Sequence, residues 1–463
     1  MLRTKPVDMT KGALLSSIAI YAFPIMLASL VQTLFNAADL AVLGNFSSTV
    51  SVAAVGATGP IVGLLVTSVI GLSNGTNVIL SRAIGAGHTA RAQRVVGSTV
   101  VLALAVGVLF GVIGIVCAPW MLTVTDCDAS YMADAQLYLT LYFIGIPFIM
   151  LYNFGAAILR VSGDSQRPLV YMIACGGLNV VLNIVLCLIL PQKVAAVAIA
   201  TVASQLLGAV LVLWRLIRTE GECRLDLRHL SFSFRELWQI VKVGIPSAFN
   251  TALYCISNLQ IQAAINAFGP ASTAGNAATA QIEGIASSFT TAIQASTLAF
   301  LGQNLGAGNR ERVRKTFLYH LILGFSGGLV LGVGLYLLGV PLLDIFVPND
   351  ALAAETIRFG LVRMQHVLAI YFIAGLNGVL VAAVQAFGYP ILPMINSIVT
   401  VLLFRVVWMS WIYPVLPTGP DPVQNSVNLY ACYPWSWSLS LAVNILLFTV
   451  IYLRYRRGRL KTV

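Results

Sequence analysis

Apolar runs long enough to cross a membrane as helices follow one another along almost the whole chain. A hydrocarbon core about 30 Å thick needs about 20 apolar residues at helical rise. Twelve runs meet that length: 14–43, 52–81, 95–118, 131–159, 168–190, 194–217, 238–268, 273–303, 316–341, 355–387, 391–414 and 436–453. With 58% hydrophobic and only 9% charged residues, 463 residues have too little polar surface for a water-soluble globule. The sequence therefore predicts an all-α, polytopic membrane protein.

Three pairs of landmarks recur at nearly one offset, which indicates a duplicated half. They are Gly-Ala-Gly at 85–87 and 306–308, Pro24 and Pro246, and Gly163 and Gly388, separated by 221, 222 and 225 residues. Each half holds six expected spans, an even number, so both halves enter the membrane in the same direction. We expect two six-helix repeats related by a pseudo-two-fold axis along the membrane normal.

The polar stretch between the halves divides the chain into an N-terminal six-helix bundle (1–218), a cytoplasmic linker (219–236) and a C-terminal six-helix bundle (237–463). Of the 27 Lys and Arg residues, 23 fall in the two ends of the chain and after the second, fourth, sixth and eighth spans. By the positive-inside rule this side is cytoplasmic. We expect both termini to be cytoplasmic and the protein to lie in the plasma or inner membrane.

Several short motifs favour structural roles. The Gly-Ala-Gly stretches lack the Gly-Lys-Ser/Thr of a phosphate loop and suit a turn that closes a helix. The stretch "GLSNG" at 71–75 has the spacing of a nucleophile elbow but lies within an apolar run, so no enzyme is expected. Seven cysteines without a CxxC pair indicate neither a disulfide framework nor a zinc site. We expect no cofactor, the pattern identifies no metal ligands, and the basic residues between spans do not suit nucleic acid.

Only two of the 16 acidic residues fall well within expected spans, namely Asp39 and Glu283. Ionised groups are expensive in hydrocarbon and usually mark an ion or substrate path. Asp39 ends a polar stripe with helical spacing, formed by Ser29, Gln32 and Asn36. Such a stripe is unfavourable toward lipid, so we expect it to face the bundle interior or a water-filled cavity.

Other polar residues pair at the same helical spacings in later spans. Asn179 and Asn183 are four apart, as are Thr201 and Gln205, and Glu283 follows Asn276 and Thr279 on one face. Hydrogen bonding between helices is an alternative role for the amides. For Glu283 three roles remain open: a substrate-cation anchor, a coupling site, or an ion pair with Arg405 in the eleventh span.

The chain resembles the multidrug and toxic compound extrusion (MATE) transporters over nearly its whole length. The resemblance is carried by "ILRVSGDSQRP" after the fourth span, "GLNVVLNIVL" in the fifth, "VAAVAIATVASQ" in the sixth and "GQNLGAGNRERVRK" after the eighth. It implies a pair of six-helix bundles that exports organic, often cationic, compounds in exchange for protons or sodium ions. The expected partners are therefore small organic cations or drugs, the coupling ions and the lipid bilayer, with the protein acting as a monomer.

The resemblance also implies roles for single residues. Asp39 matches the acidic residue that proton-coupled MATE members carry in the first span, with Asn179 and Thr201 as its neighbours. The expected cation-coupling residues are Asp39, Asn179, Asn183 and Thr201, and the expected substrate-binding residues are Gln32, Asn36, Asn153, Asn276, Glu283 and Asn377. Asn183 replaces a second acidic residue of many members. Asn377 and Gln385 lie in the tenth span, where members that use the C-terminal half for cations often carry an acid.

One alternative function has a related two-lobed architecture, a flippase for lipid-linked oligosaccharides. A pyrophosphate headgroup would need cationic residues inside the cavity, and Arg405 is the one clear candidate within the spans.

Overall fold

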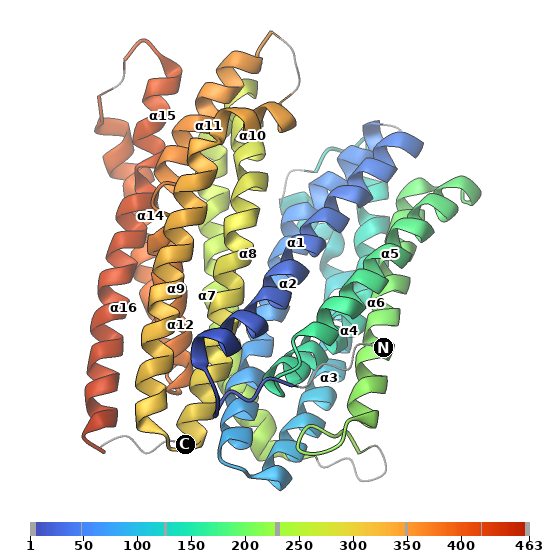
Figure 1. Cartoon of the computed structure of the whole chain (residues 1–463). Coiled ribbons are helices and arrows are strands. Elements are labelled where there is room, and N and C mark those ends of the chain that lie inside the picture. The colour runs from blue at the N-terminus through green and yellow to red at the C-terminus, as the bar shows by residue number, and fades with distance from the viewer. Residues whose placement is uncertain are drawn as a thin grey trace. The chain divides into compact units, whose positions relative to one another are not determined.

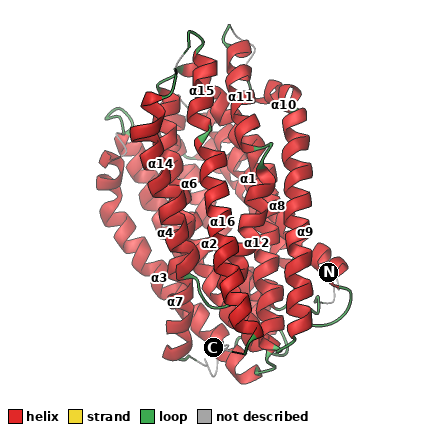
Figure 2. Cartoon of the chain, turned by 90° about the vertical axis from the view of Figure 1, so that its left-hand side faces the viewer, coloured by secondary structure: helices red, strands yellow, loops and turns green. Residues whose placement is uncertain are grey.

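The computed structural model describes residues 6–47, 49–124, 127–226, 232–347, 351–417 and 419–458. Within these ranges the side chains of 36, 37, 40, 41, 44, 45, 49, 50, 52 and 53 are not described. Every regular element in the described ranges is a helix and none is a strand (Figure 2). The predicted all-α class is confirmed.

The chain folds into two compact units. The first comprises Met1–Gly12 and Ala19–Ala248, and the second comprises Ala13–Ile18 and Phe249–Val463. The linker residues before α7 (Phe234–Asn266) therefore belong to the first unit. In Figure 1 the helices of the first unit run from blue to green, and those of the second run from green to red apart from the blue start of α1.

Six long helices follow one another in the N-terminal half, where six spans were expected. They are α1 (Leu14–Phe46), α2 (Thr49–Gly85), α3 (Thr89–Val124), α4 (Met132–Val161), α5 (Gln166–Ile189) and α6 (Lys193–Arg218). Helix α4 packs against α2, α3 and α6 and is the most enclosed of them. Glycines permit this packing: a Cβ atom on Gly107 of α3 would lie 2.7 Å from the Cα of Pro147 of α4.

The second unit contains the rest of α7 and a longer series of helices. They are α8 (Pro270–Gly306), α9 (Arg310–Leu337), α10 (Gly339–Phe346), α11 (Ala353–Val367), α12 (Tyr371–Ala386), α13 (Ile391–Ser397), α14 (Phe404–Val407), α15 (Pro422–Tyr430) and α16 (Cys432–Arg456), with π-helical turns η1 (Ile398–Leu403) and η2 (Trp408–Ile412) and a 3-10 turn η3 (Tyr413–Val415). Helix α8 packs against α9, α11 and α12, and much of its surface is buried.

Two expected spans of this half are not single regular helices. The run 355–387 is divided into α11 and α12, which bend by 44° at a short break. The run 391–414 alternates between α-helical and π-helical turns on either side of α14. The bend has no proline, whereas the π-helical turns lie between Pro393 and Pro414, which are the usual sequence signal of an irregular helix.

Ten described helices are long and apolar enough to cross a membrane, and the bent pair α11–α12 makes an eleventh. The remaining expected span, the eighth (273–303), corresponds to α8, which has 37 residues. Its many Ala, Ser and Thr residues keep its hydropathy below that of the others, which fits a helix that is largely enclosed by protein. The fold is that of a polytopic protein with two six-helix repeats.

The repeated glycine turns have the same backbone conformation in both halves. Gly87 and Gly308 follow α2 and α8 with φ of 69° and 68°, and Gly163 and Gly388 follow α4 and α12 with φ of 88° and 87°. Each donates its amide to a carbonyl in the last helical turn, as a left-handed C-terminal cap requires. The expected structural role of the Gly-Ala-Gly stretches is confirmed, and it is their second glycine that adopts the left-handed conformation.

Candidate functional site

A hydrogen-bonded polar cluster joins three helices inside the first unit. The Asn183 amide on α5 donates to Oδ1 of Asp39 on α1 at 2.6 Å and lies 3.3 Å from Oδ1 of Asn179, one turn earlier. Asn179 in turn donates to the Thr201 hydroxyl on α6 at 3.5 Å. The structure thus brings together all four residues expected to couple to a cation.

The environment of this cluster is enclosed. Asn183 is fully buried and Asn179 is 5% exposed, while Asp39 is partly buried. Two buried tyrosines of α4, Tyr138 and Tyr142, lie near enough to interact electrostatically with Asp39. No basic side chain among the described residues pairs with Asp39, so its negative charge is opposed only by neutral dipoles. The Asp39 carboxyl is therefore held by hydrogen bonding and has no ionic partner among the described residues.

Of the other residues expected in this half, neither Gln32 nor Asn153 is described as hydrogen-bonded to the cluster. Gln32 is half-buried on α1, and the Asn36 side chain lies outside the described residues. Asn153 donates its amide to the Ile149 carbonyl on its own helix at 2.8 Å. For Asn153 this contact is a local helix interaction rather than a polar group presented to a ligand.

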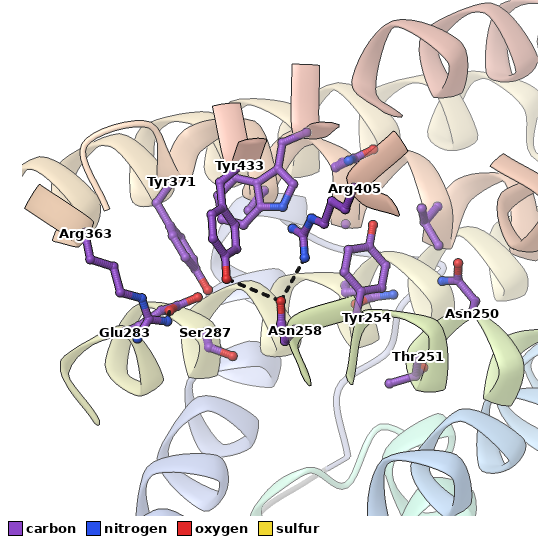
Figure 3. A pocket seen from close by; sticks show the side chains of 16 residues that line it. Asn250, Thr251, Tyr254, Asn258, Glu283, Ser287, Arg363, Tyr371, Arg405 and Tyr433 are labelled. Atoms are coloured by element: carbon purple, nitrogen blue, oxygen red, sulfur yellow. Dashed lines mark hydrogen bonds and ion pairs between the residues drawn. The ribbon is translucent and has the colours of Figure 1, made fainter. Parts of the chain in front are cut away.

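The second unit holds a cavity of about 320 Å³ that is lined by both polar and aromatic side chains (Figure 3). Its walls come from α7, α8, α11, α12, α14 and α16. One line of polar residues belongs to α7, where Asn250, Tyr254 and Asn258 follow at spacings of four. The volume falls within the range of sites for drug-sized molecules.

Glu283 and Arg363 form an ion pair at one end of this cavity. Nη2 of Arg363 lies 2.7 Å from Oε2 of Glu283, and the side chains are 9% and 21% exposed. Nη1 of Arg363 donates to the backbone carbonyl of Asn276 at 2.5 Å. The expected alternative pairing of Glu283 with Arg405 is therefore wrong. Arg363 lies on α11, before the bend, and its side chain enters the cavity beside Glu283 (Figure 3).

Arg405 lines the same cavity with a different set of partners. It is 1% exposed, and its Nη1 donates to Oδ1 of Asn258 at 2.8 Å and to the Ser257 hydroxyl at 3.2 Å. Its guanidinium also stacks on the Tyr433 ring, 4.4 Å from the ring centroid. All three partners are neutral.

Of the remaining two expected residues, Asn377 lines the cavity and Asn276 does not. Asn377 of α12 lines the cavity and accepts a hydrogen bond of 2.6 Å from the amide of Asn444. Asn276 donates to Oε1 of Gln262 at 2.7 Å, and it touches the site through its backbone contact with Arg363. Its side chain therefore supports α7–α8 packing rather than the cavity wall.

The comparison with protein-family models finds the MatE model, which matches residues 24–185 and 246–410. The chain belongs to the MATE family. The Bacillus subtilis probable multidrug resistance protein YpnP is 26% identical over 87% of this MATE chain and 89% of its own. A crystal structure of MATE in complex with MaL6 has a TM-score of 0.87 at 21% identity, covering 98% of this chain and 99% of that one. A transporter of the MOP superfamily from Pyrococcus furiosus has a TM-score of 0.85 at 21% identity, and the whole of both chains is covered.

Sequence reasoning missed several cavity residues of this MATE protein. Arg363 is a basic residue inside an expected span, which is a signal in itself. The spacing of Asn250, Tyr254 and Asn258 on one helical face was a second available signal. No sequence signal pointed to Tyr433 as a cavity residue, because its aromatic-rich stretch also suits a membrane interface.

Proposed function

We propose that this MATE transporter is a secondary active antiporter that exports drug-sized organic compounds in exchange for protons, with Asp39 as the coupling carboxyl. The observation that carries the proposal is the enclosed Asp39 cluster, in which a single carboxyl faces neutral amides and hydroxyls. Membership in the MATE family supports export of drugs as the overall activity. The polar cavity of the second unit supplies a compartment of suitable size for the exported compound.

The contact between Asp39 and Asn183 favours a proton over a sodium ion. The Asn183 amide presents an N–H group rather than an oxygen to Oδ1 of Asp39. A sodium ion would need that face of the carboxylate and further oxygen ligands, so Asn183 would first have to turn away. A proton needs only one carboxylate oxygen, and it removes the charge whose burial is unfavourable.

Everted vesicles with an acidic interior test this proposal. The wild type should accumulate a fluorescent dye when the pH gradient is imposed, because lumenal protons leave in exchange for dye. Asp39→Asn removes the titrating group and retains a similar shape, so it should abolish uptake while equilibrium dye binding stays within about twofold. Glu311→Gln serves as the matched control, since Glu311 is exposed at the start of α9 and lies outside the cluster.

Two outcomes would contradict the coupling assignment. Full proton-driven uptake by Asp39→Asn would move the coupling group elsewhere, with Glu283 as the next candidate. Uptake that follows an imposed sodium gradient and ignores the pH gradient would replace the proton by sodium.

The oligosaccharide flippase is less well supported by the cavity. It does contain two arginines, as a pyrophosphate headgroup would require, but Glu283 neutralises one of them. A volume of about 320 Å³ suits a single drug-sized molecule rather than a lipid-linked oligosaccharide.

A further inference from the structure

The cavity of the second unit has an excess of positive charge. Its charged lining consists of Arg363, Arg405 and Glu283. Glu283 and Arg363 neutralise each other at 2.7 Å. Across the described part of the chain, no carboxylate lies within salt-bridge distance of Arg405. One buried guanidinium charge in the cavity lining is therefore left without a counterion among the described residues.

The contacts of Arg405 orient its guanidinium but do not neutralise its positive charge. Asn258 and Ser257 accept hydrogen bonds from Nη1, and the Tyr433 ring supports one face of the group. The buried Nε has no hydrogen-bond partner among the described atoms. Figure 3 shows Arg405 reaching into the pocket toward Asn258 and Tyr433. Burying an uncompensated charge is costly, and an anionic ligand would offset that cost.

The local backbone around Arg405 is also irregular. The four residues of α14 lie between two π-helical segments, η1 and η2. π-helical turns are uncommon, and they frequently occur at functional sites. Here they flank the one turn that carries the uncompensated guanidinium.

We propose that Arg405 is an anion-binding subsite of the transport cavity, and that the substrates include aromatic organic compounds carrying a carboxylate. The planar guanidinium matches a carboxylate through paired N–H donors. Tyr433 and Trp437, which line the same cavity, provide aromatic surface beside it. The assignment deepens the proposed function, because it rests on this cavity being the substrate site.

Binding of two dyes with one xanthene skeleton tests the subsite. Fluorescein carries a free carboxylate and is anionic, whereas rhodamine 123 is an ester and cationic. The full-length protein in phosphatidylcholine nanodiscs should bind fluorescein in a polarisation titration. Arg405→Gln should weaken fluorescein binding by on the order of tenfold or more and leave rhodamine 123 binding unchanged or tighter. Arg358→Gln is the matched control, because Arg358 is 58% exposed and pairs with Asp421.

A second variant keeps the arginine and supplies it with a counterion. Asn258→Asp preserves the side-chain shape and places a carboxylate where Oδ1 lies 2.8 Å from Nη1 of Arg405. It should therefore weaken fluorescein binding as Arg405→Gln does, without lowering the melting temperature. If Arg405→Gln does not fold, the fluorescein affinity of Asn258→Asp alone tests whether Arg405 is an anion-binding subsite.

Unchanged fluorescein affinity in Asn258→Asp, or equal losses for both dyes, would overturn the subsite. The titration uses no ion gradient, so a failure of proton coupling would leave its result unaffected. Conversely, the vesicle experiment on Asp39 can fail while the dye preference at Arg405 is retained.

Discussion

Glu283 determines the charge balance of the cavity in the second unit. Because it is paired with Arg363, its carboxylate is already satisfied before any ligand binds. A cationic substrate would have to compete with the Arg363 guanidinium for this carboxylate. Removing the Glu283 charge would leave two arginines facing the same cavity with no counterion. The role of Glu283 therefore depends on its ion pair with Arg363 as well as on its own position within a span.

Glu283→Gln should lower affinity for rhodamine 123 and raise affinity for fluorescein, because the variant makes the cavity more positive. It should also reduce stability by about 1–3 kcal/mol, since Arg363 loses its ionic partner. Thermal unfolding of the purified protein measures the second effect. The double variant Glu283→Gln/Arg363→Gln should recover much of the stability. Equal affinity losses for both dyes in Glu283→Gln would instead indicate a packing role.

At the residue scale, the spacing of polar residues in the sequence predicted which side chains share one face of a helix. It was less successful in predicting which side chains of different helices contact each other. Asn179 and Asn183 lie four apart on one face of α5, and both contact the Asp39 cluster. Asn183 supplies the direct hydrogen bond to Asp39. The partner of Glu283 was not predictable in this way, because Arg363 is 80 residues away and lies on another helix, α11.

Helix pairs in the second unit depend on close backbone approach at glycine. Gly324 of α9 and Gly375 of α12 face each other so closely that a Cβ on Gly375 would lie 2.2 Å from the Gly324 carbonyl oxygen. In a membrane, where apolar burial between helices contributes little, such van der Waals contact is a main source of association. Gly334, on the same α9 helix, has open space around its missing Cβ.

Gly375→Ala should lower the stability of the protein, whereas Gly334→Ala should not. The first forces α9 and α12 apart at a backbone contact and should cost about 1–3 kcal/mol. The second meets no neighbour and removes a flexible helix residue, so it should be neutral or stabilising by up to about 1 kcal/mol. Melting temperatures of the purified variants check both signs. A Gly375→Ala protein as stable as the wild type would contradict the close contact.

At the element scale, helix positions were predictable because the hydrocarbon core imposes a minimum apolar length. The bend after α11 and the π-helical turns around α14 were not predicted. Residues 368–370 at the bend are Leu, Ala and Ile, which carry no helix-breaking signal. Both features arise where polar groups of several helices converge on one cavity, so tertiary contacts override local preference there.

At the scale of the whole molecule, the duplication accounts for most of the architecture. Four glycine turns with matching conformation close α2, α4, α8 and α12, at corresponding positions of the two halves. In the first unit the N-terminal segment contacts the second of these turns, because the Val7 amide donates to the Gly163 carbonyl at 3.0 Å. A smaller cavity is lined by the N-terminal segment, the ends of α2, α4 and α6, and the start of the linker. These segments therefore lie at one end of the first unit.

That common end should face the cytoplasm, since it carries most of the basic residues of the half. Arg224 in the linker is exposed and suits a reporter cysteine. The neighbouring Cys223 does not, because burial, with the charge of Glu222 beside it, raises the pKa of its thiol to about 12. In a cysteine-free background, Arg224→Cys should react with a membrane-impermeant maleimide in everted vesicles and not in intact cells. Ala129→Cys, exposed between α3 and α4, should show the reverse pattern. Labelling of position 224 in intact cells, with protection of position 129, would invert the proposed orientation.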